Sequence, residues 1–251
     1  MVALNLSFLF AAAHCIIEDN RVPRKEIPKK IVVGGTTFND GDGETIEVYC
    51  ITLHPEYNPD PNRGASQYYH DIAILRLATP SCQKPAVINT DPNRPKLELE
   101  QLITMGMGFT DETETQPSQE LREKKVASTS NQYCGGDPNF DGRICVGDVG
   151  GGSCAGDSGG PLILQQNKWL VGVDSVRNGT CGRYVTHTRV SRYAEWIQSQ
   201  IDCVECQYWP NPGYCPNPGI MARASTFLTG NIQKVVKYFY PHSENPSLRK
   251  R

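Results

Sequence analysis

The stretch Gly156-Asp157-Ser158-Gly159-Gly160-Pro161 holds a serine between glycines, and Cys154 lies just before it. Glycine adopts backbone conformations that other residues avoid, so this composition predicts a tight turn with open space in front of the Ser158 hydroxyl. Such a turn also leaves backbone N–H groups available to a developing oxyanion. The segment is therefore either an ordinary loop or the position of a nucleophile, and a base elsewhere in the chain would decide between them.

Two further segments contain residues that could activate this serine. Residues 11–15 read AAAHC and contain His14, and residues 71–77 read DIAILRL and begin with Asp71. The three contexts, in the order His, Asp, Ser, resemble those of the chymotrypsin/trypsin family of serine proteases, and the resemblance covers residues 4–201. It implies a serine endopeptidase in which Ser158 attacks the peptide carbonyl, His14 is the general base and Asp71 orients the imidazole.

The resemblance also implies an oxyanion hole and a specificity pocket. The N–H groups of Gly156 and Ser158 match the family's oxyanion hole. Gly152, six residues before the serine, matches the base of the pocket, where trypsin-type members have an aspartate, and two further pocket positions fall at Arg177 and Val185. Because Gly152 supplies no anion and the other two side chains narrow the pocket, we predict no preference for cleavage after Arg or Lys. Small apolar or acidic residues are expected instead.

The ten cysteines of this chain favour disulfides in an oxidising compartment, and hence a secreted protein. The family resemblance implies two of the pairs, Cys134–Cys145 and Cys154–Cys181. The lone CxxC at residues 203–206 has no second half with the spacing of a zinc site. We therefore expect no metal and no cofactor.

Composition indicates a globular protein built from many short strands. The chain has 251 residues, is 38% hydrophobic and 21% charged, and contains 23 glycines and 18 prolines, which favour turns over long helices. Its formal net charge of −2 argues against nucleic acid as a partner. The family fold is all-β: two six-stranded antiparallel β-barrels around a cleft, with a C-terminal helix. The expected partners are protein or peptide substrates and possible protein inhibitors, with no membrane, and we expect a monomer.

The pattern of apolar residues predicts several elements of that fold. Residues 4–13 should form a buried strand that delivers His14 to the cleft, and residues 44–53 a second strand. Residues 1–13 also resemble a signal peptide, but they lack a basic segment, so we favour the strand. No run approaches the roughly 20 apolar residues of a membrane helix. Residues 191–201 match the family's closing helix.

Residues 31–35 read IVVGG after a lysine, which resembles the site where family members are cleaved during activation. Cleavage there would leave His14 on the removed piece. In the family, by contrast, the new terminus lies before the histidine. A strand rich in β-branched residues that ends at a glycine turn explains the same letters, and we favour it.

The chain divides into a protease domain, residues 1–202, whose first barrel is incomplete, and a Cys/Pro/Asn-rich extension, residues 203–251. Repeated Pro-Asn-Pro-Gly units cannot build a packed core alone, so the extension is expected to be poorly ordered, or else to dock a partner. Residues 232–240 could form a short amphipathic helix.

Two departures from the family pattern bear on activity. Cys15 lacks its usual upstream partner, and Asp157 lacks the terminal Ile or Val amine that pairs with this aspartate in active members. An uncompensated buried carboxylate favours rearrangement, which would loosen the oxyanion hole. We therefore expect an N-terminally incomplete member of a secreted protease family, with a less active or inactive homologue that binds protein or polysaccharide as the alternative.

Overall fold

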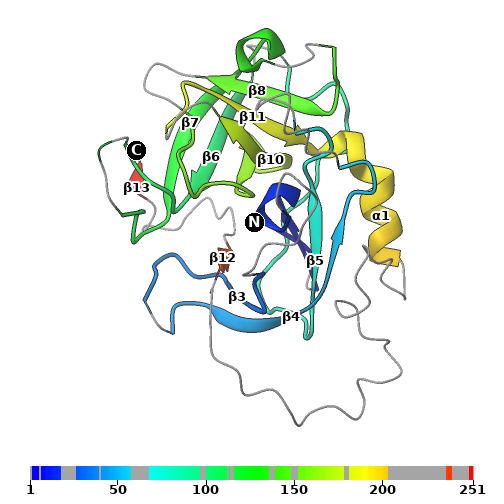
Figure 1. Ribbon diagram of the computed structural model, residues 1–251, viewed down its shortest axis with the longest axis vertical. Coiled ribbons are helices and arrows are strands. Elements are labelled where there is room, and N and C mark those ends of the chain that lie inside the picture. The colour runs from blue at the N-terminus through cyan, green and yellow to red at the C-terminus, as the bar shows by residue number, and fades with distance from the viewer. Residues whose placement is uncertain are drawn as a thin grey trace.

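The computed structural model of the 251-residue chain describes residues 2–5, 7–17, 27–39, 41–57, 68–96, 100–111, 113, 116–135, 139–147, 152–177 and 181–202, together with two short strands at 236–238 and 249–250. Within these residues, two β-sheets and one α-helix, α1 (Ala194–Asp202), form the fold (Figure 1). The 3-10 turn η5 (Val190–Tyr193) leads into α1, so the expected helix begins a few residues late. Among the described residues, no helix is both long and apolar enough to span a bilayer.

The N-terminal sheet is open and lies in the lower half of Figure 1. Its strand order is β1-β2-β5-β4-β3-β12. The bounds are Val2–Asn5 for β1, Phe8–Ala11 for β2, Lys30–Val33 for β3, Glu44–Leu53 for β4, Ala73–Leu77 for β5 and Val236–Tyr238 for β12. All neighbours are antiparallel except β12, which runs parallel to β3.

The expected buried strand before His14 is present as β2, but its length is wrong, because the chain reverses within residues 4–13 and forms the β1–β2 pair. A 3-10 turn, η1 (Ala13–Cys15), follows directly and carries His14. At residues 31–33 the strand interpretation agrees with the structure, since Ile31 is fully buried and pairs with Ile46 of β4. At residues 236–238 a strand replaces the expected helix, and apart from this strand and the one at residues 249–250 the extension lies outside the described residues.

The second sheet closes into a six-stranded barrel, seen in the upper half of Figure 1. The order β7-β6-β9-β10-β11-β8 is completed by pairing of β8 with β7, and β13 (Arg249–Lys250) lies along the outside of β7. The bounds are Gln101–Gly106 for β6, Arg122–Thr129 for β7, Arg143–Gly147 for β8, Pro161–Leu164 for β9, Leu170–Arg177 for β10 and Tyr184–Arg189 for β11. The prediction of an all-β fold with an incomplete first barrel is therefore confirmed.

Apolar side chains from both sheets share one core. This cluster contains Phe10 and Ile74 of the open sheet, Ile103 and Val173 of the closed barrel, and Ile197 of α1, all at most 3% exposed. Each sheet also has a separate cluster of its own. Burial of apolar surface at the shared cluster therefore holds the two sheets together.

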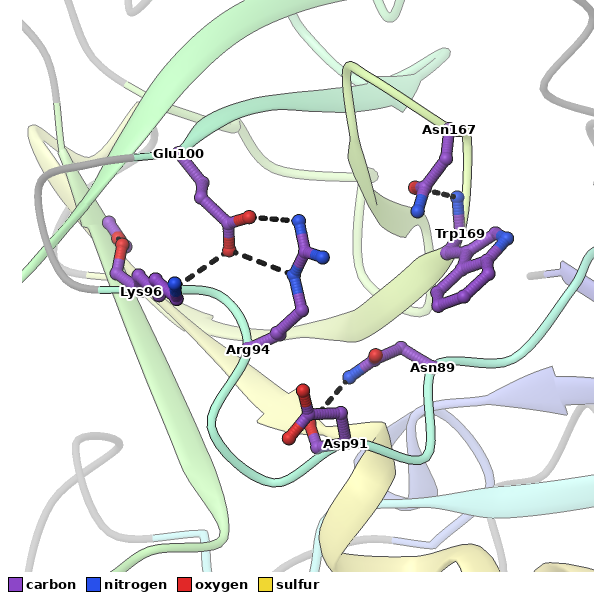
Figure 2. A network of polar contacts seen from close by, with 8 residues as sticks. Asn89, Asp91, Arg94, Lys96, Glu100, Asn167 and Trp169 are labelled. Atoms are coloured by element: carbon purple, nitrogen blue, oxygen red, sulfur yellow. Dashed lines mark hydrogen bonds and ion pairs between the residues drawn. The ribbon is translucent and has the colours of Figure 1, made fainter.

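The connection between the sheets is attached to the closed barrel. Asn89 N donates to the Leu170 carbonyl at 2.9 Å, so the connection runs beside the start of β10. Figure 2 shows the next part of this segment, where the Arg94 guanidinium and the Glu100 carboxylate form a bidentate ion pair. Paired hydrogen bonds of this kind fix orientation as well as position.

Candidate active site

Ser158 lies on a tight turn immediately before β9. Gly156 and Gly159 adopt φ values of +92° and +81°, which residues with a side chain rarely adopt. The Gly160 N–H donates to the Asp157 carbonyl at 2.8 Å and closes the turn. The glycines flanking Ser158 are therefore required by the backbone conformation of the turn.

Two N–H groups of this turn remain available. Gly159 N donates to the Asp174 carbonyl at 2.8 Å, and Gly160 N is used within the turn. Within the described part of the chain, the N–H groups of Gly156 and Ser158 donate to no other group. These are the two groups that the sequence assigned to the oxyanion hole.

The backbone brings His14 and Asp71 together at one end of the open sheet. β2 and β5 pair antiparallel, with Ala11 opposite Ala73, so the residues after β2 meet those before β5. His14 Nδ1 lies 2.7 Å from Asp71 Oδ2, and the His14 backbone N–H donates to Asp71 Oδ1 at 2.9 Å. Both carboxylate oxygens are thus engaged by one residue, which fixes the orientation of the imidazole.

The closed barrel holds the same aspartate from the other side. Ser175 Oγ of β10 donates to Asp71 Oδ2 at 2.5 Å, and Thr188 Oγ1 of β11 donates to the Asp71 carbonyl at 2.8 Å. Burial would raise the pKa of Asp71, but His14 and the hydrogen bonds from His14 and Ser175 outweigh it and lower the pKa. Ser175 and Thr188 could not be predicted from the sequence, because a hydroxyl residue within a strand has no distinguishing local pattern.

The His14 imidazole is paired with Asp71 at Nδ1 and lies beside the Cys15 sulfur at Nε2. Burial disfavours the charged ring, but the Asp71 carboxylate and the Cys15 sulfur outweigh burial and raise the pKa of His14 well above 6.5. His14 Nε2 lies 3.6 Å from Cys15 Sγ, and no hydrogen bond joins His14 to Ser158 among the described residues. Such contacts are commonly long in proteins without substrate.

Asp157 is 3% exposed, and its carboxylate holds the turn in place through two backbone hydrogen bonds. Its Oδ1 accepts from Gly108 N and its Oδ2 from Cys154 N, each at 2.8 Å. A Cβ on Gly106 would overlap Asp157 Oδ1. The absence of a side chain at Gly106 of β6 therefore makes room for this carboxylate, a role that the local sequence does not indicate.

The three residues assigned to the specificity pocket lie together. Arg177 and Val185 are opposite each other in the β10–β11 ladder. A Cβ on Gly152 would lie 2.8 Å from Val185 Cγ2, and Val185 is fully buried. The valine therefore fills the space next to Gly152.

Two disulfides join the segments around the turn. Cys154 is bonded to Cys181, 27 residues away, and Cys134 to Cys145, 11 residues away. The first bond connects the segment that precedes the Ser158 turn to the segment that precedes β11.

A buried ionisable pair, not predicted from the sequence, is connected to the turn by backbone hydrogen bonds of Asp174. Asp174 and His187 are fully buried, with Oδ2 and Nε2 3.5 Å apart. Burial raises the pKa of Asp174 and lowers the pKa of His187, so it favours the neutral form of each. The backbone of Asp174 is linked to the turn, because its N–H donates to the Gly160 carbonyl at 2.8 Å.

One group of side chains has the donors for a metal ion. One ligand atom each from His54, Glu56 and His70 lies within 4.8 Å of the other two. Burial, together with the neighbouring His70, lowers the pKa of His54 to about 4, and burial also lowers the pKa of His70. Both imidazoles are therefore neutral at pH 7.

Comparison with known proteins gives consistent matches. The family model described as Trypsin matches residues 2–197. Coagulation factor XII of Cavia porcellus is 31% identical over 218 residues, 76% of this chain and 34% of the relative. Tissue-type plasminogen activator of Mus musculus is 28% identical over 227 residues, 80% of this chain and 38% of the relative, so the chain spans between a third and two fifths of these relatives.

A solved structure has the same fold. Neuropsin, described as a serine protease expressed in the limbic system of mouse brain, superimposes with a TM-score of 0.67 at 25% sequence identity. The match covers 80% of this chain and 87% of neuropsin.

Proposed function

Because this chain belongs to the trypsin family of serine proteases, we propose that it is a serine endopeptidase with Ser158 as its nucleophile. The observation that supports this most is the hydrogen-bonded pair of His14 and Asp71, which both sheets hold in place. Ser158 lies on the glycine turn before β9, so base and nucleophile come from different sheets.

The proposed reaction follows the triad mechanism of this family. Ser158 Oγ attacks the peptide carbonyl while His14 Nε2 takes its proton, and the N–H groups of Gly156 and Ser158 bind the oxyanion. Loss of one such donor typically lowers the rate on the order of 10²-fold or more. His14 then protonates the leaving amine, and water hydrolyses the acyl-enzyme by the same steps. Asp71 keeps the proton on Nδ1 and stabilises the imidazolium.

Labelling of the full chain by a fluorophosphonate tests this assignment. We expect covalent labelling at Ser158 and no labelling of Ser158→Ala. Ser199→Ala is the matched control, since Ser199 is exposed on α1, and it should label like the unmodified protein. A folded chain that does not label, or that labels at another serine, would contradict the proposal.

We further propose that the pocket takes small apolar or acidic residues and not Arg or Lys. Gly152 offers no carboxylate, and the buried Val185 side chain leaves little depth beside it. Fluorogenic peptides that differ only in the residue before the scissile bond measure this preference. Fastest turnover after Arg or Lys is the outcome that excludes it.

The setting of the enzyme is proposed on the same grounds. Residues 1–202 would be the protease domain and residues 203–251 a separate extension. The two disulfides support an oxidising, extracellular location. There the monomeric protein would act on protein substrates and meet protein inhibitors, without nucleic acid or membrane.

A further inference from the structure

Three side chains capable of binding a metal meet at the end of the open sheet from which Asp71 projects. β4 and β5 pair antiparallel with Leu53 opposite Ala73, so the residues after β4 face those before β5. His54 directly follows β4, Glu56 lies in the next turn, and His70 precedes β5. Strand pairing therefore juxtaposes residues that are 14 to 16 positions apart in the sequence.

The donor atoms of this group lie near one another, and a small side-chain movement would bring them to the spacing of zinc ligands. One ligand atom of each residue lies within 4.8 Å of the others, and His70 Nδ1 is 3.6 Å from Glu56 Oε2. The rings of His54 and His70 are nearly parallel, with an interplanar angle of 10° and centroids 5.0 Å apart. The two imidazoles are therefore stacked on each other, with the Glu56 carboxylate next to His70.

The backbone and neighbouring rings restrict the two imidazoles. His70 has φ +55°, a left-handed conformation that is uncommon for a residue with a side chain. Tyr193 Oη lies 3.3 Å from His70 Nδ1. The rings of Trp196 and His54 pack edge to face, with their centroids 4.9 Å apart. Packing of this kind reduces the conformational freedom that an ion would otherwise have to remove.

The surrounding charges permit a divalent cation. Glu56 contributes a carboxylate whose side chain is 70% exposed and therefore free to adjust its rotamer. Arg192, whose charge acts on both imidazoles, is paired with Asp141 at 3.0 Å, so its charge is compensated.

We propose that His54, Glu56 and His70 form a zinc-binding site, with water completing the coordination. Two imidazole nitrogens and one carboxylate oxygen are a donor set that favours Zn²⁺ over the hard cations Ca²⁺ and Mg²⁺. The ion would join the end of β4 to the segment that carries Asp71, because His70 is the residue before it. The site concerns binding alone and does not depend on the proposed catalytic function.

Calorimetric titration of the full chain with zinc chloride tests the site. The free thiols Cys15 and Cys82 are also potential zinc ligands, so the titration uses a Cys15→Ser/Cys82→Ser background. We expect one zinc ion to bind at this site. At a hundredfold excess over the dissociation constant, zinc should raise the melting temperature by about 5 °C or more.

Two variants and one control assign the ion. Glu56→Gln and His70→Asn should each weaken zinc binding about tenfold or more. Glutamine at an exposed position preserves the fold, and asparagine tolerates the left-handed backbone of residue 70. Glu47→Gln removes a similarly exposed carboxylate on β4 and should bind zinc like the background protein. Absence of binding, or binding that both variants leave unchanged, would overturn the proposal.

Discussion

Asp71 is the residue on which the candidate site depends most. It accepts hydrogen bonds from the backbone and ring of His14 and from the hydroxyl of Ser175, and its carbonyl accepts from Thr188. A fully buried carboxylate needs such partners, since an unpaired one would be neutralised or expelled. One side chain of the open sheet is thereby tied to two strands of the closed barrel.

The raised pKa of His14 predicts the pH dependence of hydrolysis. The ring must be neutral to accept the Ser158 proton, so activity should be lost as pH falls through a pKa well above 6.5. Asp71→Asn removes the charge that raises this pKa, so the acid limb should move to lower pH and the rate should fall by about 10⁴-fold. The measurement is kcat/KM for a fluorogenic peptide between pH 5 and pH 10.

The matched control for this profile is Asp91→Asn, which changes an exposed aspartate on the connection between the sheets. Its profile should coincide with that of the unmodified enzyme. An acid limb at or below pH 6.5 in the unmodified enzyme would contradict the role given to the His14–Asp71 pair.

At the level of elements, the segment from Cys154 to Gly160 is constrained at several points. The Cys154–Cys181 disulfide joins it to the segment before β11, and the Asp157 carboxylate joins it to Gly108 after β6. The backbone of Asp174 in β10 pairs with Gly159 and Gly160. The turn that presents Ser158 is therefore fixed by three separate strands or strand ends.

Removal of each disulfide in turn should distinguish its contribution to the stability of the fold from its contribution to the position of the Ser158 turn. In the chain-entropy account, loss of Cys154–Cys181 lowers the free energy of unfolding by about 3–4 kcal/mol, and loss of Cys134–Cys145 by about 3 kcal/mol. Only Cys154→Ala/Cys181→Ala should also lower kcat/KM strongly, because only that bond borders the Ser158 turn. Denaturant unfolding and peptide hydrolysis, measured where both double variants are folded, give the two quantities.

The Cys134→Ala/Cys145→Ala variant is the control of similar chemistry in a neighbouring part of the same barrel. Equal losses of kcat/KM in the two double variants would mean that the Cys154–Cys181 bond has no special role in positioning the turn.

At the scale of the whole molecule, the candidate site exists only where the two sheets meet. His14 and Asp71 belong to the open sheet, and Ser158 and Ser175 to the closed barrel. The shared apolar cluster that includes Phe10 and residues of β6, β10 and α1 is the main physical link between them. Packing of the sheets and assembly of the site should therefore be one event.

Truncation of a side chain in this shared cluster tests that coupling. Phe10 is fully buried, so Phe10→Ala should lower the free energy of unfolding by about 3–5 kcal/mol. Calorimetry of the unmodified chain should show that both sheets unfold in a single thermal transition. Fluorophosphonate labelling should decline in the same temperature range. Phe38→Ala, at a side chain that is 40% exposed, should change stability little. Two resolved transitions in the unmodified chain would show that the sheets unfold independently.

Much of the fold and of the candidate site could be predicted from local sequence together with the family resemblance. The glycines around Ser158, the contexts of His14 and Asp71, and the β-branched pattern of residues 44–53 all encode local conformation, and the structure has those local forms. Local patterns also misled, since residues 4–13 read as one apolar strand while the chain turns back within them. Apolar character predicts burial there and does not specify where the chain reverses.

Contacts between distant segments were decided only by the tertiary structure. Ser175 and Thr188 reach Asp71 across 104 and 117 positions, and nothing in their own strands distinguishes them from other hydroxyl residues. His54, Glu56 and His70 likewise match no metal-binding spacing, and they meet because β4 and β5 pair. The sequence by itself determined which residues can perform the chemistry and the local turns that carry them. The packing of two sheets determined which side chains hold them in place, because hydrogen bonds and apolar contacts depend on distance in space and not along the chain.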